Sequence, residues 1–303
     1  PGLPRDLDAL VLRALRPRID ERYDGSEAMR AALAGWLGKA APTTDAARLG
    51  RFLSDLFGET INEQREGTLR LLHNLRESHA PPPPPPPSAA TPARLKTGAL
   101  VDDRYLLRRV IGEGGMGEVW EAEHRQIGRT VAIKFLRHLH ARGPQAMEAF
   151  RQEARAASRI GHPNVVDVTD AGTHGDTLYL VMELLQGRTL LEELKEGPRP
   201  LLRALYIAQQ VADTLAAAHR EGVVHRDLKP ANIFLATPRP GAVVPKLLDF
   251  GIVKVLDRDA NVARTETRTF LGTPHYTSPE QAMDASAIDV RSDQWAIGVI
   301  LYE

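Results

Sequence analysis

The sequence predicts an α+β protein in which a small, β-rich lobe precedes a larger helical lobe, with a helical segment ahead of both. Three observations support this prediction. Apolar residues recur at helical spacing before residue 80, and a run of prolines follows them. From residue 105 onward, apolar and polar residues alternate around a glycine cluster, and after residue 194 the pattern becomes mostly helical.

The composition narrows the class of protein. The chain has 303 residues, 43% of them hydrophobic and 26% charged, which is typical of a soluble globular protein with one large or two ordinary domains. Its 39 basic residues equal its 39 acidic ones, so we expect no nucleic-acid partner. The chain has no Cys, which excludes disulfides and thiolate metal sites and fits a cytoplasmic location.

The hydropathy of the chain and its two ends lead to expectations about membrane segments, a signal peptide and the extent of the polypeptide. No run of 18 or more apolar residues occurs, so we expect no membrane segment in this chain, although its parent could be membrane-anchored elsewhere. The opening "PGLPRDLDAL" lacks the basic and apolar regions of a signal peptide. Because the chain starts at Pro1 and stops within the pattern "GVILYE", we expect a piece of a longer polypeptide.

The first segment is predicted to be helical over residues 5–79, within a unit spanning 1–80. Seven consecutive prolines, Pro81 to Pro87, open a Pro-rich linker at 81–97. Such a run favours polyproline II, about 3.1 Å per residue, and would act as a stiff spacer of roughly 20 Å. A ligand for a Pro-binding domain is the alternative. The helical periodicity rests on Leu7, Leu10, Val11 and Leu15, and then on Met29, Leu33, Trp36 and Leu37.

The β-rich part is predicted from the strands around "GEGGMGEV", from "RTVAIKFL" and from "TLYLVMELL", with a helix at "QAMEAFRQEARAASRI". Glycines allow a backbone to approach phosphates closely, although a simple turn would also explain the cluster. Its place between two strands argues against a dinucleotide-binding fold. Lys134 lies in the apolar strand "VAIK" and needs an anion, for which Glu153 in the predicted helix is a candidate.

The stretch "VVHRDLKPANIF", residues 223–234, is far more specific. It places Asp227, Lys229 and Asn232 on one short loop, and "DFG" follows with Asp249 behind a short strand. A carboxylate can accept a hydroxyl proton, an ammonium can neutralise a phosphoryl oxygen, and an amide oxygen can hold a cation. These residue types indicate phosphoryl-transfer chemistry.

In this order the motifs resemble those of the eukaryotic-type Ser/Thr protein kinases, especially the bacterial members, over about residues 98–303. The resemblance implies a two-lobed protein kinase fold, with a small lobe at about 98–186 and a large lobe at about 187–303. It also implies that ATP and Mg²⁺ bind between the lobes and that protein hydroxyls accept the phosphoryl group. A second kinase molecule is a candidate partner.

The resemblance assigns roles to individual residues. Asp227 would be the catalytic base, assisted by Lys229, while Lys134 would contact the phosphates and pair with Glu153. Asn232 and Asp249 would hold Mg²⁺. The nucleotide would contact Ile111, Gly112, Gly114, Gly117, Val119, Ala132, Lys134, Met182, Glu183 and Leu185.

Regulation and support of the catalytic loop follow from the same resemblance. Thr273 would help to hold Asp227 and Lys229, and Asp293 would lie beneath the catalytic loop. Arg226 could bind a phosphate added to one of the threonines that precede "SPE", since phosphorylation adds roughly −1.5 to −2 charges. Those threonines are Thr265, Thr267 and Thr269, of which the last two are the preferred autophosphorylation sites.

The first helices gain an interpretation from the resemblance too. In this family the Glu of "SPE", here Glu280, pairs with an Arg between the last two helices of the large lobe. The stretch "LDALVLRALRPRIDERYDGSEAMRAAL" matches such helices, with Arg22 at that position. Residues 1–80 are therefore the tail of a preceding kinase domain, an unrelated helical regulatory domain, or helices that dock on the incomplete lobe as in a circular permutant.

Two functions remain open at this point. The chain is predicted to be a Ser/Thr protein kinase that autophosphorylates its activation loop. The alternative is a non-catalytic, nucleotide-binding scaffold, and ATP binding without turnover would distinguish it.

Overall fold

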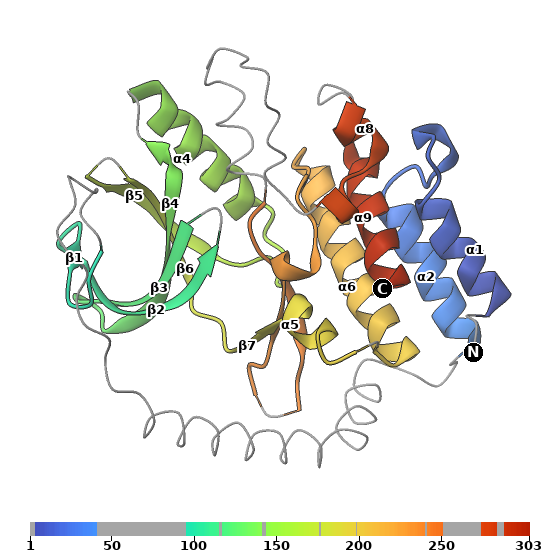
Figure 1. Ribbon diagram of the computed structural model, residues 1–303, viewed down its shortest axis with the longest axis horizontal. Coiled ribbons are helices and arrows are strands. Elements are labelled where there is room, and N and C mark those ends of the chain that lie inside the picture. The colour runs from blue at the N-terminus through green and yellow to red at the C-terminus, as the bar shows by residue number, and fades with distance from the viewer. Residues whose placement is uncertain are drawn as a thin grey trace, which may run out of the picture.

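The computed structural model describes residues 4–40, 95–114, 117–140, 144–175, 177–197, 199–239, 241–250, 274–283 and 288–303. Within these ranges the molecule has a β-rich lobe and a helical lobe, with the first helices on the far side of the helical lobe (Figure 1). None of the helices in these ranges combines the length and the apolar character of a membrane span.

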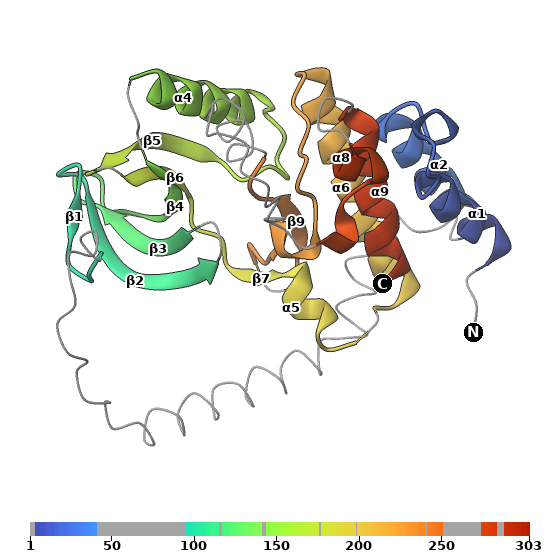
Figure 2. The same ribbon diagram turned by 45° about the horizontal axis from the view of Figure 1, so that its top comes forward.

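The small lobe is a six-stranded antiparallel sheet in the order β1-β2-β3-β4-β6-β5, with helix α4 lying along one side (Figure 2). The predicted strands and helix of this lobe are confirmed. Its elements are β1 (Leu100–Val101), β2 (Tyr105–Gly114), β3 (Gly117–His124), β4 (Arg129–His140), α4 (Pro144–Arg159), β5 (Val168–His174) and β6 (Thr177–Glu183).

The two faces of this sheet bury different sets of side chains, because successive strand residues point to opposite faces. Trp120, Ile133, Phe135, Tyr179 and Val181 form one buried cluster on the face turned away from α4 and the large lobe. The other face carries Ala132, Leu136, Leu180 and Met182, which belong to the main core together with α4 and the large lobe. Lys134 therefore points to the face where the lobes meet.

The large lobe is built around α6, a long helix with ten buried residues. Thr189 begins α5 with a capping box to Glu192, and the Asp289 side chain caps the first turn of α9. The elements are β7 (Gly187–Thr189), α5 (Leu190–Leu194), α6 (Leu201–Arg220), η2 (Pro230–Asn232), β8 (Ile233–Ala236), β9 (Val244–Leu247), η3 (Pro274–Tyr276), α8 (Pro279–Met283) and α9 (Val290–Tyr302).

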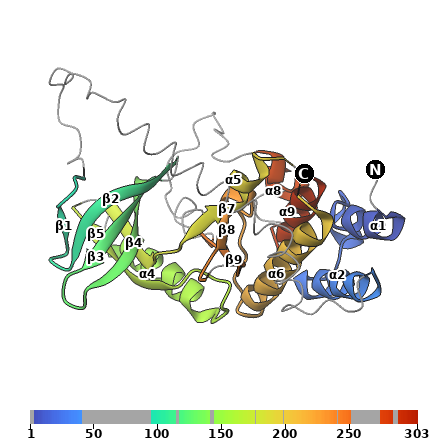
Figure 3. The same ribbon diagram turned by 90° about the horizontal axis from the view of Figure 1, so that it is seen from below.

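The first helices, α1 (Arg5–Ala14) and α2 (Ser26–Ala40), are joined by the short helix η1 (Ile19–Glu21) and pack on the large lobe. All three views place them beside α6 and α9 (Figure 3). Their inner sides are buried as the sequence periodicity predicts. The buried residues are Leu7, Val11, Ala14, Met29 and Leu33.

Three strands were not predicted from the sequence, namely β1, β5 and β7. β1 and β7 have only two and three residues, and β7 pairs with the distant strand β8, whereas β5 pairs with β6, the next strand in the chain. Short strands carry little local signal. The predicted helical stretch at 41–79 and the proline run lie outside the described residues.

Candidate active site

The predicted catalytic loop lies between α6 and η2, and it brings its three polar side chains together. Lys229 Nζ donates to Asp227 Oδ2 at 2.8 Å. Asn232 Nδ2 donates to the backbone carbonyl of Asp227 at 2.7 Å and to its Oδ2 at 3.1 Å. The two bonds to Oδ2 are charge-assisted and hold the Asp227 carboxylate in one orientation.

A buried carboxylate, Asp293 of α9, supports this loop from below. Its two oxygens accept the backbone N–H groups of His225 and Arg226, each at 2.9 Å, and His219 Nε2 lies 2.8 Å from Oδ2. Burial alone would raise the pKa of Asp293, but the hydrogen bond and charge of His219 outweigh burial and lower it. Arg226 has a positive φ of 63°, a conformation that this pair of backbone hydrogen bonds helps to hold.

The second half of the site joins the two lobes. Lys134 Nζ of β4 lies 2.5 Å from Asp249 Oδ2. Asp249 comes two residues after the end of β9. Lys134 is 7% exposed, so the carboxylate supplies the anion that the apolar strand lacks. The backbone N–H of Leu248 donates to the Asn232 carbonyl at 2.9 Å, which places Asp249 beside the catalytic loop.

The predicted adenine-binding residues share the sheet face that carries Lys134. Val119 is paired with Lys134 across β3 and β4, and Ala132 is paired with Met182 across β4 and β6. Paired residues point to the same face of a sheet, so these four side chains form one surface. Glu183 and Leu185 follow at the connection to the large lobe, and Ile111 and Gly112 lie on β2 at the edge of the same region.

The Glu183 side chain is itself held in place. Its Oε1 accepts a hydrogen bond from the backbone N–H of Asp167 at 2.9 Å. The same oxygen forms an ion pair with Lys246 of β9. The segment between the lobes is thus attached to a strand of the large lobe.

Two glycines of the cluster, Gly117 and Gly114, differ in what the fold requires of them. Gly117 has a φ of 145°, and a Cβ added there would lie 1.7 Å from the Phe135 carbonyl oxygen. A Cβ added at Gly114 would meet no atom within 4 Å, so this glycine faces open space. The fold explains Gly117, whereas Gly114 is available for a ligand.

Several predicted site groups lie outside the part of the chain that the structure describes. The side chain of Glu153 lies outside the described residues, so its pairing with Lys134 stays a prediction. The same holds for the predicted regulatory and supporting threonines, namely Thr265, Thr267, Thr269 and Thr273.

Glu280 of α8, another predicted supporting residue, is bound by side chains from two other segments. Arg22 donates to both of its carboxylate oxygens, Nη1 to Oε1 and Nη2 to Oε2, each at 2.9 Å. Ser292 Oγ donates to Oε1 at 2.7 Å. Burial alone would raise the pKa of Glu280, but the hydrogen bonds from Arg22 and Ser292 outweigh burial and lower it to about 2. The contact expected for docked first helices is therefore present.

Several residues of the site were not predicted from the sequence. His219 and Ser292 bind the two supporting carboxylates, Lys246 binds Glu183, and Gln281 Nε2 donates to the Arg226 carbonyl at 2.9 Å. Gln281 directly follows Glu280, and this adjacency was the one available signal. The other three depend on tertiary contacts.

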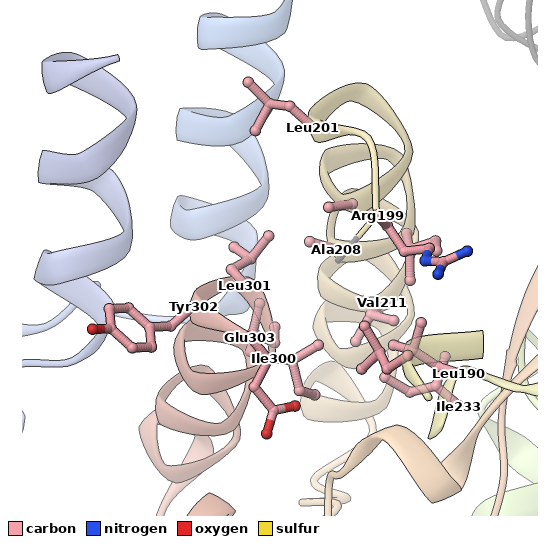
Figure 4. Close-up of a pocket in the computed structure, with 14 residues that line it drawn as sticks. Leu190, Arg199, Leu201, Ala208, Val211, Ile233, Ile300, Leu301, Tyr302 and Glu303 are labelled. Carbon is pink, nitrogen blue, oxygen red and sulfur yellow. The ribbon is translucent and has the colours of Figure 1, made fainter. Parts of the chain in front are cut away.

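A separate cavity of about 240 Å³ lies in the large lobe between α5, α6 and α9 (Figure 4). Its walls are mostly aliphatic, as with Leu190, Val211 and Ile300, and Arg199 and Glu303 lie at its edge. None of the predicted site residues lines it, so it is not part of the candidate active site.

Together these observations define a two-lobed protein kinase fold with its polar residues at the junction of the lobes. A model of the protein kinase domain family matches residues 105–303. The chain belongs to this family, within the bacterial eukaryotic-type Ser/Thr kinases. The first helices, residues 5–40, lie outside the matched range.

Individual relatives agree with this assignment. The serine/threonine-protein kinase pkn2 of Myxococcus xanthus is 46% identical over 204 residues, covering 67% of this chain and 24% of that protein. PknA of Mycobacterium tuberculosis is 42% identical over 214 residues, covering 69% of this chain and 48% of that protein. The chain thus spans less than half the length of these relatives. A crystal structure of the M. tuberculosis PknI kinase domain matches with a TM-score of 0.53 and 28% identity, covering 67% of this chain and 74% of that one.

Proposed function

We propose that this chain is a serine/threonine protein kinase that transfers the γ-phosphoryl group of ATP to hydroxyl groups of proteins. The observation that carries the proposal is the convergence of two polar groups, one of three residues and one of two, at the junction of the lobes. Asp227 is bound by Lys229 and Asn232, and Lys134 contacts Asp249 beside them. Such a set supplies a base and opposite charges for a phosphoryl group, which phosphoryl transfer requires.

The chemistry assigns a task to each residue. Asp227 accepts the proton of the acceptor hydroxyl, and the oxygen of that hydroxyl forms a bond to the γ-phosphorus. At the same time, the bond between the γ-phosphorus and the β–γ bridging oxygen breaks. Lys229 donates to Asp227 Oδ2, from where its ammonium can offset negative charge on the transferring group. Lys134 holds the α- and β-phosphates, and ADP leaves.

The donor set fits a magnesium ion. Mg²⁺ is usually held by one or two carboxylates together with substrate phosphates, and when bound it would offset phosphate charge. Asp249 offers a carboxylate. The nitrogen of the Asn232 amide is bound to Asp227, so the atom that Asn232 offers a cation is its Oδ1. Asn232 and Asp249 would hold the ion.

The nucleotide would bind under the glycine cluster. Gly112, Gly114 and Gly117 cover the phosphates, and Val119, Ala132 and Met182 contact the base with Ile111. Glu183 and Leu185 receive the adenine at the connection of the lobes. The common face of Val119, Ala132, Lys134 and Met182 supports this assignment.

We further propose autophosphorylation at Thr267 or Thr269, with the new phosphate bound by Arg226 next to the catalytic base. In the same proposal, residues 98–303 form the kinase domain, residues 1–80 are a helical segment that resembles the C-terminal helices of a kinase domain, and the 81–97 linker joins the two.

Transfer to peptides with a single acceptor tests the activity. The purified chain is incubated with Mg-ATP and matched peptides that differ only in a Ser, Thr or Tyr acceptor, and ATP binding is measured in parallel. We expect transfer to Ser and Thr but not Tyr. The Asp227→Asn variant should bind ATP as before and transfer about 10²- to 10⁴-fold more slowly.

The alternative scaffold function predicts a different result. If the wild-type chain binds ATP with the affinity of the Asp227→Asn variant and transfers no phosphate to any peptide, the scaffold is favoured over the kinase.

A further inference from the structure

The first helices are fitted closely to the large lobe. α1 approaches α9 at Gly298, where an added Cβ would lie 2.8 Å from Leu15 Cδ2 and 3.2 Å from Ala14 Cβ. Glycine at this position lets the two helices come together. Leu7, Val11 and Ala14 are buried on the inner side of α1. The contact thus has the close packing of a protein interior.

Arg22 is the polar centre of this contact. Besides its two bonds to Glu280, its Nη1 donates to the Arg291 carbonyl at 3.2 Å. Within its own segment, Nε donates to the Arg16 carbonyl at 2.7 Å and Nη2 to the Pro17 carbonyl at 3.3 Å. The side chain is fully buried, and the guanidinium lies over the Trp295 ring at 5.1 Å. A buried guanidinium with this many partners specifies one position of the segment that carries it.

The ion pair between Arg22 and Glu280 is connected to the catalytic loop through the residue next to Glu280. Glu280 and Gln281 are neighbours in α8, and Gln281 Nε2 donates to the Arg226 carbonyl at 2.9 Å. Arg226 directly precedes Asp227. A shift of α8 would therefore move an anchor of the loop that carries the proposed base.

We propose that α1 and α2 are an internal positioning element of the kinase: they dock on α6 and α9, and through Arg22 and Glu280 they set the position of the catalytic loop. The proposal rests on the proposed kinase activity. It extends the catalytic unit to residues 5–40, which precede the small lobe in the chain and lie outside the range that the family model matches. Arg22 acts through Glu280 and is a positioning residue.

Substitutions in the full chain test the effect on catalysis. Arg22→Met should lower kcat by about 10- to 100-fold, since small displacements of catalytic groups have effects of this size, while the KM for ATP stays within about twofold. Arg18→Glu is the matched control, because Arg18 lies in the same segment but pairs with Asp20 on the surface. It should behave as wild type.

The charge reversals add a rescue. Arg22→Glu and Glu280→Arg should each lower kcat and thermal stability, and combining them should recover part of both. An Arg22→Met protein that is folded and keeps wild-type kcat would overturn the proposal. So would single reversals that leave both stability and kcat unchanged.

A second experiment does not depend on activity or on the folding of a variant. A protease site replaces Pro81–Pro87 in the full chain, the purified protein is cut, and size-exclusion chromatography with mass detection follows. We expect an uncut monomer and, after cutting, co-elution of the helical fragment with the rest. Separation of the fragments would overturn the docking, and an uncut dimer would show that a second copy supplies the helices. If docking persists while the wild-type chain transfers no phosphate, the proposed kinase function fails and the docking stands.

Discussion

Arg22 and Glu280 are 258 positions apart in the sequence, yet the guanidinium and the carboxylate form two parallel hydrogen bonds of 2.9 Å each. The bidentate geometry is the strongest form of this pair, and both side chains are largely removed from solvent. Because Arg22 precedes the small lobe and Glu280 belongs to the large one, the pair joins the start of the chain to the part nearest its end.

The Glu280 pair predicts a stability that depends on acidity. The pKa of Glu280 falls from 4.5 to about 2 on folding, which corresponds to roughly 3 kcal/mol. Because the folded pKa is the lower one, this stabilisation is fully present above about pH 5 and is lost as the pH falls toward about 2. Urea denaturation of wild type and Glu280→Gln across this range measures it. The difference between the two proteins should shrink on acidification, and a constant difference would contradict the assignment.

Substitution of Asp293 is expected to lower both the stability and the activity of the protein. Asp293→Asn keeps the size of the side chain but puts an amide NH₂ where the carboxylate accepts two backbone N–H groups and faces His219. We expect a destabilisation of about 2–4 kcal/mol by denaturant unfolding, with a lower kcat. Asp213→Asn on α6 is the control: that carboxylate is half-exposed, so its loss should cost less than about 1 kcal/mol. Equal effects would contradict a special role for Asp293.

Substitution of Lys134 is expected to lower the catalytic activity while leaving the stability nearly unchanged. Lys134→Met fills the same apolar strand and removes the charge, so the free energy of unfolding should change by less than about 1 kcal/mol. The kcat/KM for ATP should fall by about 10²- to 10³-fold, since an electrostatic contact to the phosphates is lost. Lys96→Met, at an exposed lysine, is the matched control. A Lys134→Met enzyme with normal kcat/KM would contradict the role.

Substitutions of Gly114 and Gly117, two glycines of the cluster, are expected to have opposite outcomes. Gly117→Ala puts a Cβ into the Phe135 carbonyl and should lower the melting temperature, because both the backbone angle and the space require glycine. Gly114→Ala meets open space in the protein and should leave the melting temperature unchanged, while it raises the KM for ATP by reaching into the phosphate site. Thermal melts and ATP kinetics of the pair measure this. An early melt of Gly114→Ala with an unchanged KM would refute the phosphate-site role of Gly114.

A structural feature could be predicted from the sequence when the residues that form it are close together in the chain. Asp227, Lys229 and Asn232 could be predicted to act together because they share one short loop, and their mutual hydrogen bonds agree. Strands with an alternating pattern, such as β3 and β4, could also be predicted. β5 and β7 could not, because their pairing partners rather than their own residues define them.

The supporting contacts show the same limit. Ser292 and Gln281 carry no motif, and their bonds to Glu280 and to the Arg226 carbonyl follow from how α8 and α9 are packed. The resemblance named Arg22 as a partner of Glu280 but left three hypotheses open. The close approach of Leu15 to Gly298 belongs to tertiary packing and has no signature in either segment alone.

The most direct test of the proposed kinase activity is site-resolved mass spectrometry of the chain after incubation with Mg-ATP, beside the Asp227→Asn variant. We expect phosphate on Thr267 or Thr269 in the wild-type chain and none in the variant, with both proteins binding ATP. A wild-type chain that binds ATP and carries no phosphate anywhere, or a variant phosphorylated to the same level, would contradict the assignment of Asp227 as the base of an active kinase.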